Sequence, residues 1–162
     1  IPNSELAEKA GIACENGITV DERCQTSIPQ IYAAGDCTNH PNPLLNRRLR
    51  LESVPNAMEQ ARVCASNMVG KDKIYSSIPW FWSDQYELKL QMVGFSSDGD
   101  SEIIRGDMDA NQFSVFHVKE NKVMAADSVN SPKDFMICKQ LIGKEVDLDK
   151  LLDESIELKS ML

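Results

Sequence analysis

The sequence predicts an α+β domain, with an antiparallel sheet and C-terminal helices, preceded by the last part of an α/β domain. The first observation behind this prediction is a series of strand-like runs in the second half of the chain, followed by helix-like runs. The second is a short strand of small residues and a well-capped helix in the first half. The third is a polar link at residues 71–79. We therefore expect an incomplete α/β portion at residues 1–75 and an α+β domain at residues 76–162.

Local signals predict the elements of the first region. Residues 4–11 favour a helix, residues 17–21 a short strand, and residues 31–34 a buried strand of small and apolar residues that ends in Gly35-Asp36. Residues 38–46 are rich in Asn and Pro and predict a loop.

The helix that follows is marked at both ends. Ser53 offers an N-cap, Pro55 suits the first turn and Gly70 suits the exit. Arg62 falls away from the apolar positions of this amphipathic helix, so we expect it to be exposed or at the helix margin. The apolar residues at helical spacing are Ala57, Met58, Ala61, Cys64, Ala65 and Met68.

The second region carries strand patterns first and helix patterns last. The alternation of apolar and polar residues around Leu88, Leu90 and Met92 is typical of a half-buried strand. A tight link through Glu120-Asn121 predicts a hairpin between the last two strands. A helix then begins near residues 131–134 and ends at Gly143, and short acidic helices finish the chain. The other strands are expected at residues 102–105, 113–119 and 122–129.

Composition narrows the possible functions. The net charge of −8 argues against a nucleic-acid partner, despite a basic cluster formed by Arg47, Arg48 and Arg50. No apolar run approaches the roughly 20 residues that a membrane span needs, and no export signal is visible. The five cysteines show no pairing or metal-ligand spacing, which favours reduced thiols in the cytoplasm and no metal site.

The run at residues 30–36 is the first candidate for a binding site. A strand that ends in Gly-Asp places a carboxylate at the carboxyl edge of a sheet, where open α/β sheets bind ligands. Gly35 allows a ligand to approach the backbone closely, and Asp36 can accept hydrogen bonds from sugar-alcohol hydroxyls. In isolation, such a pair more often only ends a strand.

The start of the helix after Ser53 is the second candidate. A helix N-terminus presents free N–H groups and about half a positive charge, which stabilise a negatively charged ligand group. A capped amphipathic helix alone would also explain each of its residues.

The third candidate is the segment at residues 79–85, which holds both tryptophans of the chain. A generic aromatic cluster of this kind would fill a core.

All three segments resemble one family. The run TSIPQIYAAGD resembles the second FAD-binding signature of flavoprotein reductases with two dinucleotide domains. The run RLESVPNA resembles the helix that ferredoxin reductases place against the flavin. The run PWFWSDQ resembles the start of the C-terminal domain in the NADH-linked ferredoxin reductases of the putidaredoxin reductase and ring-hydroxylating dioxygenase family. The resemblance covers essentially the whole chain.

The resemblance implies a role for individual residues. Asp36, with Gly35, would hold the ribityl chain of FAD, and Val54, with Glu52, would lie at the helix end beside the flavin. Trp82 would lie at the flavin edge, with the Ser83 backbone helping to fix the ring. Arg62, Trp82 and Arg50 would meet an acidic [2Fe–2S] ferredoxin, although a solvated helix charge explains Arg62 equally well. No catalytic acid or base is implied.

The resemblance also implies an activity for the full-length protein. NADH would reduce FAD, and the flavin would pass electrons to a ferredoxin that serves an aromatic-ring dioxygenase or a P450. The chain opens on Ile-Pro-Asn and has no GxGxxG turn, so we expect a C-terminal fragment whose missing part binds NADH. We expect the fragment alone to be inactive and to hold FAD weakly or not at all, which its absorbance spectrum tests.

Two alternatives remain open from the sequence. One is a non-enzymatic interaction module, as in apoptosis-inducing flavoproteins, which share the fold. The other is an NADH-dependent disulfide or peroxide reductase. Those reductases carry a His-Pro pair at their dimer interface. The only such pair here, His40-Pro41, lies just after the Gly-Asp signature and far from the C-terminal end, which weakens this alternative.

Overall fold

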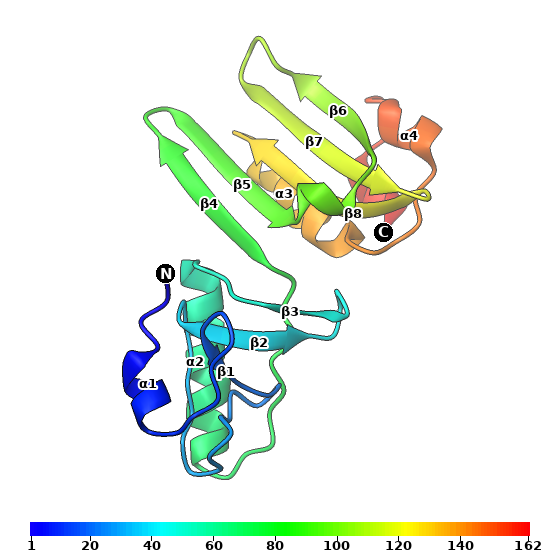
Figure 1. Cartoon of the computed structure of the whole chain (residues 1–162). Helices are drawn as coiled ribbons and strands as arrows, with labels where there is room; N and C mark the ends of the chain where they lie inside the picture. The colour runs from blue at the N-terminus through cyan, green and yellow to red at the C-terminus, as the bar shows by residue number, and fades with distance from the viewer. The chain divides into compact units, whose positions relative to one another are not determined.

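The computed structural model describes residues 1–162 and divides into two compact units, Ile1–Pro79 and Trp80–Leu162 (Figure 1). The division falls after residue 79, whereas the sequence places the domain boundary after residue 75. No helix in the structure has both the length and the apolar character that a membrane span requires.

The first unit combines a small mixed sheet with one long helix. Strand β1 (Ile18–Thr19) pairs in parallel with β2 (Thr38–Asn42), which pairs antiparallel with β3 (Arg47–Leu49). Helix α2 (Val54–Met68) lies beside this sheet, and the short helix α1 (Glu5–Lys9) precedes it in the chain (Figure 1).

Two predictions for the first unit are wrong. The predicted loop at residues 38–46 contains β2 and the turn into β3, because the Asn42 side chain accepts hydrogen bonds from the N–H groups of Leu44 and Leu45 and closes a hairpin. The predicted buried strand at residues 31–34 makes only an isolated bridge between Gln25 and Tyr32, and Ile31 is exposed. No second strand pairs with its other side, so no ladder forms.

The ends of α2 follow the predicted signals, but its buried face does not. Ser53 accepts a hydrogen bond from the Asn56 N–H, and Gly70 follows the helix with a φ of +79°. The apolar side chains of Met58 and Met68 are more than half exposed, at 51% and 65%. The buried face instead carries the polar residues Asn56 and Gln60, whose amides find hydrogen-bond partners inside the unit.

The second unit is a five-stranded antiparallel sheet with helices on one face, which confirms the predicted α+β domain (Figure 1). The spatial order is β4-β5-β8-β7-β6, so β4 and β6 form the edges. The strands are β4 (Trp80–Gln85), β5 (Leu88–Gly94), β6 (Ser101–Asp107), β7 (Gln112–Lys119) and β8 (Lys122–Val129). The helices are α3 (Pro132–Leu141), α4 (Leu148–Leu152) and the 3₁₀ turns η1 (Ser96–Asp98) and η2 (Leu158–Met161).

The core of the second unit lies between the sheet and α3. Register places Val93, Ala126, Phe116 and Ile103 in one row across four strands, and all four are buried. Phe135, on α3, is buried as well. The predicted hairpin forms at Glu120-Asn121, where both residues take a positive φ, as a type I′ turn requires.

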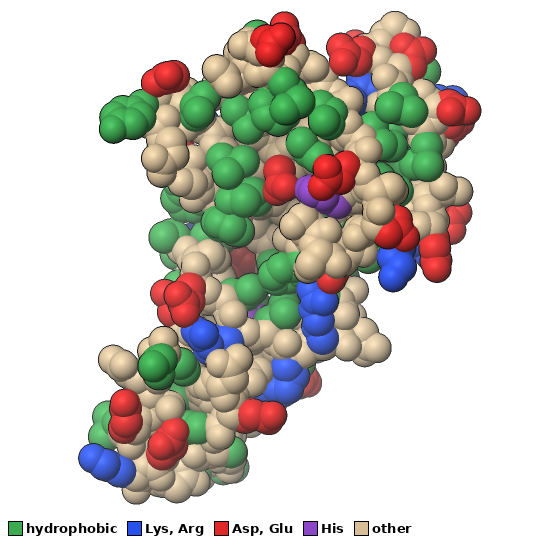
Figure 2. Space-filling model, turned by 45° about the horizontal axis from the view of Figure 1, so that its top comes forward, with side chains coloured by type: hydrophobic (Ala, Val, Ile, Leu, Met, Phe, Trp, Pro, Cys, Tyr) green, Lys and Arg blue, Asp and Glu red, His purple; other side chains and the backbone are tan.

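Two features of this sheet differ from the sequence pattern. Residues 80–85 form a complete edge strand, although their aromatic and polar mixture lacks a simple alternation. Leu90 and Met92 lie on the other face of the sheet from Val93. No helix covers that face, and both residues are only half-buried. Figure 2 shows hydrophobic side chains exposed over this unit.

Candidate functional site

The Gly35-Asp36 turn is held rigidly while its carboxylate stays free. Gly35 takes a φ of +95°, a conformation that strains any residue with a side chain, and it is buried. Its carbonyl accepts the Thr38 N–H at 3.0 Å, and its own N–H donates to Gln60 Oε1 at 2.7 Å. The Asp36 side chain is exposed and makes no hydrogen bond or ion pair within the protein. The turn therefore presents a carboxylate that is available to a ligand.

The N-terminus of α2 presents one free N–H group. The Asn56 N–H is bonded to Ser53 Oγ, the Ala57 N–H to the Ser53 carbonyl, and Pro55 has no N–H. The Val54 N–H has no partner in the protein, and its side chain is 56% exposed. This donor sits where the helix end carries partial positive charge, so an acceptor on a ligand would be stabilised there.

Arg50 joins the two candidate elements of the first unit. Its Nη1 pairs with Glu52 Oε1 at 2.5 Å and reaches the Asp36 carbonyl at 3.5 Å, and its Nε donates to Asn16 Oδ1 at 3.2 Å. The hydrogen bond and the charge of Arg50 hold the pKa of Glu52 below its usual value. Gly35, Asp36, Arg50, Glu52 and Val54 therefore gather at one edge of this unit. An ideal Cβ on Gly35 would lie 3.8 Å from the Ala57 Cβ in the first turns of α2.

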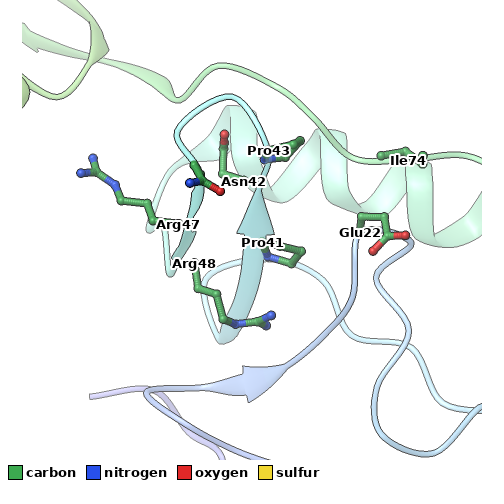
Figure 3. Close-up of a pocket in the computed structure, with 8 residues that line it drawn as sticks. Glu22, Pro41, Asn42, Pro43, Arg47, Arg48 and Ile74 are labelled. Carbon is green, nitrogen blue, oxygen red and sulfur yellow. The ribbon is translucent and has the colours of Figure 1, made fainter.

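The predicted basic cluster does not form one free patch. The Arg48 guanidinium donates to the carbonyls of Val20 at 2.7 Å and Asn39 at 2.5 Å, because β3 turns this side chain back over the sheet. Arg50 is held as described above, and the Arg47 side chain is exposed and points away from Arg48 (Figure 3). The two arginines border a shallow pocket that none of the predicted site residues lines. It is lined by Glu22, Pro41, Asn42, Pro43, Asn46, Arg47, Arg48 and Ile74.

The second unit places Trp82 on its edge strand. Trp82 is 43% exposed and lies 5.6 Å from Trp80, centroid to centroid. Trp80 is fixed from behind, since its ring packs 5.8 Å from Phe135 and the Lys139 ammonium lies 4.1 Å above it. Ser83 follows on the same strand and pairs with Leu90. This arrangement presents one aromatic face to a ligand or partner.

Arg62 is exposed on α2, as predicted, and its guanidinium makes no hydrogen bond or ion pair. It belongs to the first unit together with Asp36, Arg50 and Val54, whereas Trp82 and Ser83 belong to the second. The sites within each unit are thus defined separately.

The sequence did not point to the polar network under the Gly35 turn. Gln60 contacts Gly35, Thr38 and His40, and all three of its side-chain hydrogen bonds are buried. Burial, together with the charge of Arg48, lowers the pKa of His40 to about 4. The available signal was the four-residue spacing of Asn56 and Gln60, which places two amides on one helix face.

Two protein families match the chain. The reductase C-terminal family matches residues 80–162, and the pyridine nucleotide-disulphide oxidoreductase family matches residues 1–61. The two matches fall in the second and the first unit, respectively.

Individual relatives match along the whole chain. Putidaredoxin reductase from Pseudomonas putida is 46% identical over 164 residues, covering 100% of this chain and 39% of the relative. The ferredoxin–NAD(+) reductase component of the anthranilate 1,2-dioxygenase system from Burkholderia cepacia is 41% identical, covering 100% of this chain and 41% of the relative. The chain thus spans about two fifths of the length of these relatives.

Solved structures match the fold of the chain. The ferredoxin reductase for the CYP199A2 system from Rhodopseudomonas palustris superposes with a TM-score of 0.92 at 39% identity, covering 99% of this chain and 40% of that one. The covalent complex of putidaredoxin reductase with putidaredoxin gives 0.91 at 47% identity, covering 99% and 39%.

Proposed function

The chain belongs to the reductase C-terminal family, and from this we propose that it is the C-terminal part of an NADH-dependent ferredoxin reductase. In the full-length protein, electrons would pass from NADH through FAD to a [2Fe–2S] ferredoxin that serves an oxygenase. The relatives that support this proposal include reductases of dioxygenase systems and a reductase solved in complex with its partner, putidaredoxin. We also propose that residues 1–75 complete the FAD-binding domain and that residues 76–162 form the reductase domain.

The geometry that supports FAD binding is the pair of unused polar groups at one edge of the first unit. Asp36 offers a carboxylate without a protein partner, which suits the ribityl hydroxyls of FAD, since hydroxyls donate to carboxylates. Val54 offers an N–H without a protein partner at a helix N-terminus, which suits the carbonyl oxygen of the flavin pyrimidine. The residues present therefore fit the group, and Gly35 and Glu52 shape the backbone around them.

The residues of this chain would bind and orient, and none would act as an acid or base. Bound FAD supplies the redox chemistry, accepting a hydride and releasing electrons singly. The Val54 N–H would stabilise negative charge on the pyrimidine side of the ring. Trp82, with the neighbouring Ser83 backbone, would cover the flavin edge. No GxGxxG turn occurs in the chain, so the NADH pocket would lie outside it.

Each unit would contribute its own partner-binding residue, an aromatic anchor from the second unit and a cation from the first. Trp82 is an exposed aromatic residue, a type that is enriched at binding hot spots. Arg62 is an exposed, unpaired cation, which suits an acidic ferredoxin. Arg50 would contribute less, because Glu52 and Asn16 already hold its guanidinium. Five free cysteines support a cytoplasmic location for the protein.

The test is reconstituted electron transfer with the full-length protein. We expect NADH-dependent reduction of cytochrome c that requires, and saturates with, an added [2Fe–2S] ferredoxin. Arg62→Glu should raise the ferredoxin concentration needed for half-maximal rate, whereas Arg23→Glu, at another charged position of the same unit, should not. A rate that does not depend on ferredoxin would contradict the proposal and favour a non-enzymatic interaction module.

A further inference from the structure

Gln60 occupies the centre of a buried network that links α2 to the Gly35-Asp36 turn. Its Oε1 accepts the Gly35 N–H at 2.7 Å. The Thr38 hydroxyl lies 2.8 Å from both this oxygen and the Gly35 carbonyl, so its single proton is shared between the two acceptors. Its Nε2 lies 2.8 Å from His40 Nδ1. Gln60, Thr38 and His40 are each no more than 1% exposed, so water does not substitute for these bonds.

The Gly35 N–H fixes the orientation of the Gln60 amide. A backbone N–H can only donate, so the Gly35 N–H requires that the oxygen of the Gln60 amide faces the turn. The Gln60 NH₂ group then donates to His40 Nδ1, which must be an acceptor. His40 is therefore neutral and carries its proton on Nε2. The lowered pKa of His40 agrees with this neutral form.

Gln60 thus ties the Gly35-Asp36 turn to α2 through a buried hydrogen bond. Its side chain projects from α2, whose first residue, Val54, presents the free N–H. Its amide oxygen binds the N–H of Gly35, the residue immediately before Asp36. If the amide were lost, the Gly35 N–H would remain buried and unpaired, and the turn would relax to find another acceptor. The Asp36 carboxylate would then shift relative to the helix end.

We propose that Gln60 is a positioning residue that sets the Asp36 carboxylate relative to the Val54 N–H for FAD binding. This inference rests on the proposed function. Gln60 acts through the turn and is not expected to touch the flavin.

Another amide on the same helix provides a matched control. Asn67 lies near the C-terminal end of α2, where its Nδ2 donates to the carbonyls of Arg23 and Lys73 at 2.9 Å, and its Oδ1 accepts the Lys73 N–H at 2.8 Å. Asn67→Leu removes a comparable set of hydrogen bonds from α2 without touching the Gly35 turn. It therefore reports how far general destabilisation alone weakens FAD binding.

The experiment titrates FAD into the apoprotein of the full-length enzyme and records flavin fluorescence quenching and the visible circular dichroism of the bound flavin. We expect Gln60→Met to raise the Kd for FAD about tenfold or more and to change the dichroism band. The Kd of Asn67→Leu for FAD should stay within about threefold of the wild-type value, even when its thermal stability equals that of Gln60→Met. Gln60→Glu should also stay within about threefold, because one carboxylate oxygen can accept from Gly35 while His40 donates to the other.

The outcomes separate this inference from the proposed function. Equal Kd values for Gln60→Met and Asn67→Leu would overturn the positioning role while leaving FAD binding intact. A wild-type protein that binds no FAD would overturn the proposed function and the inference with it. If Gln60→Met does not fold, Gln60→Asn carries the same test, since its shorter side chain does not reach Gly35, and unchanged affinity would overturn the proposal.

Discussion

Arg105, on β6, donates a hydrogen bond from Nη1 to the carbonyl oxygen of Leu151, on α4, at 2.8 Å. The same guanidinium donates to the carbonyls of Lys150, Asp153 and Ile156 at distances of 2.8 to 3.3 Å. The residue is buried, at 8% exposed. A single charged side chain therefore satisfies the carbonyls at the end of a short helix and fixes the C-terminal segment against the sheet.

We predict that Arg105→Met destabilises the second unit by about 3 kcal/mol, because several buried carbonyls lose a charged donor at once. Hydrogen exchange should show the loss of protection first in residues 148–162, and denaturant unfolding measures the total loss of stability. Arg62→Met, at an exposed position, is the control and should change stability by less than about 0.5 kcal/mol. Protection of residues 148–162 that equals the wild type would contradict this role for Arg105.

The two tryptophans of β4 should separate stability from electron transfer. Trp80→Ala removes the contacts with Phe135 and Lys139 and should cost about 2 kcal/mol in the second unit. Trp82→Ala, at a more exposed position, should cost less than about 1 kcal/mol but slow ferredoxin reduction by the full-length protein. Denaturant unfolding and stopped-flow kinetics measure the two effects. A Trp82→Ala protein with unchanged kinetics would argue against a role at the flavin edge.

Asp36 should matter for FAD and not for folding. Its exposed carboxylate makes no hydrogen bond or ion pair within the protein, so Asp36→Ala should change the free energy of unfolding of the apoprotein by less than about 0.5 kcal/mol. The Kd for FAD in the full-length protein should rise about tenfold or more, since ribityl hydroxyls would lose a charged acceptor. The Kd of Asp36→Asn, which keeps one acceptor oxygen, should fall between the values of the wild type and Asp36→Ala. Unchanged FAD affinity in Asp36→Ala would remove this residue from the site.

His40 should make the first unit sensitive to acid. Its pKa is lowered from 6.5 to about 4 by burial, so the unfolded chain binds a proton between these values and the folded chain does not. The stability that neutral His40 contributes is therefore complete above pH 6.5 and is lost as the pH falls from there through about 4. The total is about 3 kcal/mol.

Denaturant unfolding at a series of pH values measures this loss. In His40→Asn the loss between pH 6.5 and 4 should be smaller, because asparagine keeps an acceptor near Gln60 but does not titrate. Identical pH profiles for the two proteins would contradict the assignment of this effect to His40.

Local signals explain which parts of the fold could be predicted from sequence. Alternation and turn chemistry located β5 to β8, and capping residues located α2, because these signals act within a few residues. Strand β4 was missed because its aromatic residues fall on both faces of an edge strand. The segment at residues 31–34 has strand composition, but only one side finds a partner.

The candidate site divides in the same way. Gly35, Asp36 and Val54 could be proposed from motifs, since their chemistry depends on the local turn and the helix end. The role of Gln60 could not be predicted, because it depends on contacts with Thr38 and His40, which the sequence placed in a loop. The sequence also did not show that the Arg48 guanidinium is held by carbonyls that only the tertiary fold brings near.

Anaerobic stopped-flow spectroscopy of the full-length protein tests whether electrons pass from NADH through FAD to a ferredoxin. The protein is mixed first with NADH and then with an oxidised [2Fe–2S] ferredoxin. We expect FAD absorbance to be lost on mixing with NADH and to return as the iron–sulfur absorbance of the ferredoxin falls. A protein without FAD, or one whose NADH-reduced FAD leaves the ferredoxin oxidised, would contradict this expectation.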